Sequence, residues 1–221
     1  MIAGHLVLKW AHIIAMVYWL GGEWGVFQTS YHVTNPKLPL AERLRHQETA
    51  YRIDILARTG IILLLPLGLH MGVNFGVVPF GRTALPAIWV VAAAWLGLCW
   101  AAFIRRGTES GLRLTIWDER VRYVLIPVLL TSALLSLATG HPFTAKWYAA
   151  KVGIYALLLV IGLVLRFVMR HWTEIFRALA AGPRPDLEAQ LAREIAMARR
   201  LAYLYWFGIG TVAFIGVTKF F

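Results

Sequence analysis

Six long apolar stretches, each typical of a membrane-crossing helix, divide this sequence. They cover residues 6–33, 53–78, 85–104, 124–139, 145–168 and 201–217. A helix rises about 1.5 Å per residue and the hydrocarbon core of a bilayer is about 30 Å thick, so about 20 apolar residues cross it. A hydrophobic content of 59% excludes a soluble globular protein. We therefore expect an all-α polytopic membrane protein, with six transmembrane helices in a bundle that forms a single domain over residues 1–221.

The basic residues predict the orientation of these helices. Most of the 22 Lys and Arg residues lie in or beside the connectors after the first, third and fifth stretches. The positive-inside rule makes that side cytoplasmic and places both termini in the periplasm, in a bacterial inner (cytoplasmic) membrane. Two amphipathic segments, near residues 40–51 and 185–200, are expected on the cytoplasmic surface. Topology thus explains the net charge of +11, and we expect no nucleic-acid partner.

Two histidines lie at a similar depth in the first two stretches. His12 is about 9 Å and His70 about 12 Å below the periplasmic surface, as judged by helical rise. An ionisable side chain in a spanning helix normally faces protein, water or a ligand. Two inward histidines on neighbouring antiparallel helices can bind a haem iron from both sides. The sequence therefore predicts that His12 and His70 are the metal ligands of a haem b, although each alone could form a helix–helix hydrogen bond.

Basic residues on the same side lack acidic partners there and are candidates for the two haem propionates. We expect these groups to be bound by the residues Lys9, Arg82, Lys146 and Lys151, with His141 as an alternative ligand or a propionate neighbour. Long basic side chains near helix ends also commonly reach the lipid phosphates.

Copper is an alternative metal for the same region. Met16 lies one helical turn from His12, and Met71 follows His70 directly. Imidazole and thioether ligands together suit Cu(I), so a mixed site is consistent with the sequence.

Glu23 is the acidic residue within the first stretch. It lies eleven residues after His12, about 20° away around the helix, so both side chains share one face. We expect Glu23 to pair with Arg58 or to act in proton transfer. A second haem held by His32 and His171 near the cytoplasmic surface is a further alternative.

Glycines repeat every four residues in the second stretch, at Gly68, Gly72 and Gly76. This spacing predicts a face of small residues that allows close helix packing, with His70 pointing to the other side of that helix.

Three short motifs resemble a group of bacterial membrane proteins. They are Lys9-x-x-His12 with Trp19 and Gly21-Gly22, Arg52-Ile53-Asp54, and Trp147-x-x-x-Lys151. The group comprises the HemJ-type protoporphyrinogen oxidases, the CopD-type copper-resistance proteins and the membrane part of cytochrome-linked urate oxidase. The resemblance implies haem b binding by His12 and a functional role for Lys151.

These observations predict a b-type cytochrome that carries out electron transfer in the membrane. Its partners would be a quinone or a periplasmic electron carrier, and other membrane subunits could dock on the tryptophan-rich third stretch. The alternatives are a HemJ-like protoporphyrinogen IX oxidase and a CopD-like copper transporter.

Overall fold

The computed structural model describes the backbone of residues 2–220 and the side chains of residues 4–220. Over that range the chain forms α1 (Ile2–Val33), α2 (Leu40–Phe75), α3 (Leu85–Ile104), α4 (Glu109–Thr139), α5 (Lys146–Ala180) and α6 (Pro185–Thr218), with one 3₁₀ turn, η1 (Arg82–Ala84). The described residues include no β-strand. The expectation of an all-α protein is confirmed.

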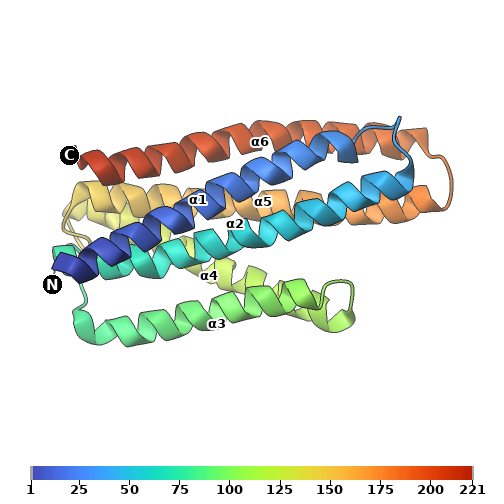
Figure 1. Cartoon of the computed structure of the whole chain (residues 1–221). Coiled ribbons are helices and arrows are strands. Elements are labelled where there is room, and N and C mark those ends of the chain that lie inside the picture. The colour runs from blue at the N-terminus through green and yellow to red at the C-terminus, as the bar shows by residue number, and fades with distance from the viewer. Residues whose placement is uncertain (1, 221) are drawn as a thin grey trace.

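The six helices form a closed ring. Each helix packs against the next along the chain, and α6 returns to pack against α1, while α2 and α5 also meet across the ring. Figure 1 shows the two termini at the same end of the structure, beside the start of α1 and the end of α6. The other end contains the connectors after α1, α3 and α5, which we call the arginine-rich end.

Five of the helices are long and apolar enough to cross a membrane: α2, α3 with η1, α4, α5 and α6. The chain is therefore a multi-pass membrane protein. The first helix, α1, is not among these five. Apolar side chains nevertheless cover its outer surface, as shown by Val7, Trp10 and Val17, each more than half exposed.

The two amphipathic segments do not form separate surface helices. Residues 40–51 are the beginning of α2 and residues 185–200 the beginning of α6, each continuous with the apolar part that follows. Their apolar sides pack against the ends of α1 and α5 and form a second core. This core includes Val33, Trp172 and Ile195. Burial in this core explains why the segments continue into α2 and α6 as single helices.

Close contact between α1 and α2 determines which face of α1 is turned inward. A Cβ atom at Gly22 would lie 2.8 Å from the Cβ of Ala57, and one at Gly60 would clash with the backbone of Ala15 and Trp19. Only glycine permits this approach, so the two helices fit together in one register. That register places His12 opposite Gly68, where an added Cβ would be 3.7 Å from the imidazole Cε1 atom.

Candidate functional site: a histidine cavity and an arginine cavity

A cavity of about 430 Å³ lies between α1, α2, α5 and α6, in the half of the protein that contains both termini. Its size is within the range of 300–1,000 Å³ that is usual for small-molecule and cofactor sites. His12 lines it from α1, and we call it the His12 cavity.

The His12 imidazole lacks a protein partner on one side. Its Nδ1 atom is buried and makes no hydrogen bond to any other part of the described chain. An unsatisfied buried polar atom costs about 1–3 kcal/mol. This cost is avoided when a proton donor, a water molecule or a metal binds the ring, which makes His12 the main candidate for a ligand-binding residue.

Three lysines line the same cavity: Lys9 from α1, Lys151 from α5 and Lys219 just after α6. Within the described residues, none of them forms an ion pair with a carboxylate. The Lys219 ammonium group lies 4.1 Å from the centroid of the Phe75 ring and 5.3 Å from that of Trp147. The cavity therefore combines apolar walls with several positive charges that no carboxylate of residues 4–220 neutralises.

Aromatic rings form much of the cavity wall, and their polar atoms are engaged elsewhere. The Tyr148 hydroxyl donates to the carbonyl oxygen of Gly68 at 3.1 Å, and the Tyr155 hydroxyl donates to that of Ile61 at 2.8 Å. Both oxygens belong to the backbone of α2, so the tyrosines also join α5 to α2. What the rings present to the cavity is mainly apolar surface.

The structure does not bring His70 into this cavity. The Nδ1 atom of His70 instead accepts a hydrogen bond from Nε1 of Trp89 on α3, at 3.3 Å. Gly68 faces His12, and two residues further along a helix correspond to a rotation of about 200°. The structure therefore does not bring His12 and His70 together as the predicted pairing on one iron requires, because only His12 lines the cavity.

The predicted cations are only partly brought together. Lys9 and Lys151 line the cavity as expected, whereas Arg82, Lys146 and His141 are not among its lining residues. Arg82 lies in η1, Lys146 begins α5, and His141 belongs to the turn between α4 and α5. Sequence reasoning missed the role of Lys219, although a basic residue followed by two phenylalanines at the end of an apolar stretch was a usable signal.

The two methionines proposed for copper do reach the cavity. Met16 and Met71 line it together with His12. A mixed imidazole and thioether site therefore remains geometrically available, without His70.

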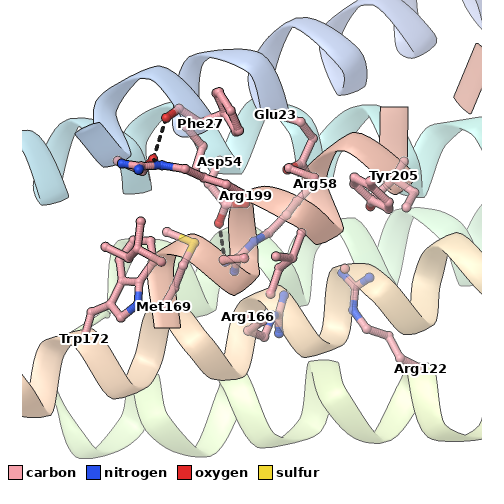
Figure 2. Close-up of a pocket in the computed structure, with 18 residues that line it drawn as sticks. Glu23, Phe27, Asp54, Arg58, Arg122, Arg166, Met169, Trp172, Arg199 and Tyr205 are labelled. Carbon is pink, nitrogen blue, oxygen red and sulfur yellow. Dashed lines mark hydrogen bonds and ion pairs between the residues drawn. The ribbon is translucent and has the colours of Figure 1, made fainter. Parts of the chain in front are cut away.

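A second, smaller cavity of about 70 Å³ lies further along the same face of α1, toward the arginine-rich end. We call it the arginine cavity, because Arg58, Arg122, Arg166 and Arg199 line it together with Glu23 (Figure 2). Arg58 forms an ion pair with Asp54 one turn away. The expected pair between Glu23 and Arg58 is not formed in the structure, where Glu23 makes no ion pair with a described residue.

Asp118, which sequence reasoning missed, organises the arginines from α4. Its carboxylate accepts a hydrogen bond from Trp95 Nε1 at 2.7 Å and forms an ion pair with Arg166. The Nε atom of Arg122 lies 3.6 Å from the same carboxylate, which is too long for a hydrogen bond. The spacing of four residues predicts the contact between Asp118 and Arg122 within α4. No such local spacing predicts the ion pair between Asp118 and Arg166 of α5.

The second haem site proposed for His32 and His171 is not assembled. Nδ1 of His171 lies 2.9 Å from the carboxylate of Glu194 on α6. The His32 ring stacks on His46 with a centroid distance of 4.3 Å.

The chemistry of the His12 cavity has to be interpreted from its own residues. A comparison of the chain with family models, curated proteins and solved structures finds no match. In the described part of the chain, no group of three or more His, Cys, Asp or Glu residues is arranged to bind a metal. A metal ion bound by His12 would thus need most of its ligands from another source, such as a macrocycle or the two methionines.

Proposed function

We propose that the His12 cavity binds haem b and that the protein is a membrane haem protein of electron transfer. The observation that supports this most is the buried Nδ1 atom of His12, unpartnered within the described chain, in an apolar cavity with three lysines that pair with no described carboxylate. A haem is a flat apolar ring with two carboxylates, and it supplies four of its own nitrogens to the iron. A site with a single histidine and several ammonium groups suits that combination.

Each group of residues then has a defined task. His12 would bind the iron through its imidazole, and Lys9, Lys151 and Lys219 would pair with the propionates. The rings of Trp147, Tyr148 and Tyr155 would exclude water from the apolar faces. The haem would supply one-electron redox chemistry. Because His70 lies outside the cavity, we do not propose it as an iron ligand.

We further propose that all six helices cross a bacterial inner membrane, with both termini periplasmic. The apolar outer side of α1 and the position of both termini at one end support this arrangement. The arginine-rich end would then be cytoplasmic. The His12 cavity would lie in the periplasmic half, where a quinone or a periplasmic carrier could exchange electrons with it.

Two other functions share the same cavity. Protoporphyrinogen IX is another flat tetrapyrrole with two carboxylates, so a HemJ-like oxidase would use the same lysines. Copper transport is favoured by a separate observation, the presence of Met16 and Met71 beside His12.

An optical spectrum together with metal analysis of the detergent-purified protein tests the proposal. We expect a reduced-minus-oxidised spectrum of b-type haem, which is lost in His12→Ala and retained in the matched variant His70→Ala. Loss of haem in both variants to the same extent would contradict the single-histidine site. Wild-type protein that contains copper and no haem, even when expressed with added haem precursor, would establish the copper alternative instead.

A further inference from the structure

The arginine cavity contains more positive charge than the protein neutralises. Four arginines line it, at positions 58, 122, 166 and 199, while the carboxylates that line or pair with them are Glu23, Asp54 and Asp118. One formal positive charge remains when every carboxylate is ionised. A buried excess charge is costly unless an ion of opposite sign accompanies it.

Arg122 shows most directly that a partner is missing. Only 4% of its surface is exposed, and its Nε atom is buried without a hydrogen bond inside the described chain. Asp118, its nearest counter-ion, already accepts from Trp95 and pairs with Arg166. Figure 2 shows Arg122 and Arg166 extending into the same space as Arg58, so their guanidinium groups approach one cavity from three helices.

Arg199 lies at the side of the cavity nearest the arginine-rich end. It donates to the hydroxyls of Ser30 and Thr34, at 3.0 and 3.2 Å, and stacks on the Tyr31 ring at 3.8 Å. No described carboxylate pairs with it. A guanidinium held by neutral groups keeps its full charge available to an approaching anion.

The volume of the cavity limits what can bind. At about 70 Å³ the cavity is far below the range of 300–1,000 Å³ that is usual for small-molecule and cofactor sites, which favours a small ion over a larger ligand. The hydrogen bond from Trp19 Nε1 to the Tyr205 hydroxyl, at 3.1 Å, joins a wall of the His12 cavity to a wall of the arginine cavity.

We propose that the arginine cavity is a binding site for one small inorganic anion, between chloride and phosphate in size. Arg122, Arg166 and Arg58 bind the anion and Arg199 attracts it from the arginine-rich end. When it is ionised, Glu23 opposes binding through its negative charge. This inference does not depend on what occupies the His12 cavity.

The test measures binding of chloride, bromide and phosphate to detergent-purified protein at constant ionic strength. Gluconate, a much larger organic anion, replaces them in the reference buffer. Binding is followed by the rise in unfolding temperature and by calorimetric titration. Bromide also allows the site to be located in crystals by its anomalous scattering. We expect saturable binding of at least one of these anions and a bromide peak beside Arg122.

Matched variants distinguish the site from general attraction to a basic protein. Arg199→Gln is expected to weaken anion binding by about tenfold, whereas Arg200→Gln, which removes the same charge from an exposed neighbour, leaves it unchanged. At a pH at which Glu23 is ionised, Glu23→Gln is expected to tighten binding by about tenfold, a gain that misfolding cannot produce.

Three results would overturn the proposal. They are the absence of binding in the wild-type protein beyond that in gluconate, equal effects of Arg199→Gln and Arg200→Gln, and a bromide peak only outside the cavity. A haem spectrum that is lost or retained does not affect any of these results, so this proposal and the proposed function fail independently.

Discussion

Neutralising Asp118 should destabilise the protein strongly, because two buried arginines depend on its charge. The residue is 1% exposed, and Arg166, with which it pairs, is 8% exposed. The substitution Asp118→Asn keeps the size of the side chain and an oxygen that can accept from Trp95. Removing one partner of a buried ion pair typically costs about 3–5 kcal/mol. We expect a loss of that size in the free energy of unfolding.

The exposed pair between Arg184 and Asp186 provides the control. Its two hydrogen bonds, at 3.0 and 2.7 Å, have the geometry of a good ion pair, yet the groups lie at the surface. Exposed pairs contribute little because water screens them. Asp186→Asn should therefore leave stability unchanged within error. Unfolding in mixed detergent, followed by tryptophan fluorescence and circular dichroism, measures both variants under the same conditions.

A double variant shows whether the charge itself is responsible. Adding Arg166→Met to Asp118→Asn removes one of the two stranded charges, so the combined loss should be smaller than the sum of the separate losses, with a coupling of about 1–3 kcal/mol. Chloride or phosphate should also recover part of the stability of Asp118→Asn, because an anion could replace the missing carboxylate. If Asp118→Asn is no less stable than Asp186→Asn, the charge balance that we assign to this cluster is wrong.

Two further predictions concern the helix contact and the lysines. Gly60→Ala should lower the free energy of unfolding by about 1–3 kcal/mol, because the added Cβ overpacks against the α1 backbone. The control Gly97→Ala, where an added Cβ meets open space, should be neutral or slightly stabilising. Thermal unfolding compares the two variants, and equal stabilities would contradict the close contact. Lys151→Gln should weaken haem retention during purification by about tenfold relative to the control Lys146→Gln, because Lys146 lies outside the cavity. The haem-to-protein ratio of the purified variants measures this, and identical ratios would exclude a propionate contact at Lys151.

Much of the fold could be predicted from the lengths of the apolar stretches. A membrane-crossing helix needs a continuous run of apolar residues that few other structures require. The ends of the helices were harder to predict. A segment such as residues 40–51 has the same amphipathic pattern whether its apolar side meets lipid or another helix. The second core, with Ala50 against residues of α5 and α6, depends on contacts that are distant in the chain and that no local pattern records.

The face of a helix on which a residue lies could be read from the sequence for α1. His12 was expected to point inward and it lines the cavity together with Lys9, while what these residues bind stays a prediction. The pairing of His70 with His12 was predicted from their similar depths. The direction in which the His70 side chain points from α2 did not enter that prediction. The glycine repeat already contained that information, because Gly68 and Gly72 mark the side of α2 that packs closely, and His70 lies on the other side.

The inward face of α1 also explains why the two cavities lie in line. His12 and Glu23 are separated by eleven residues, or about three turns, and each lines one of the cavities. Trp19, which lies between them on the chain, is 2% exposed and bonded to Tyr205, so the boundary between the cavities is a packed pair of rings. This packed boundary is poor in water, so charge in one cavity is less screened from the other than it would be in solvent. An anion near Arg122 would therefore offset positive charge that otherwise acts on an iron near His12. The two proposals, although separate in their tests, thus concern two charged cavities that lie in line along the inward face of α1.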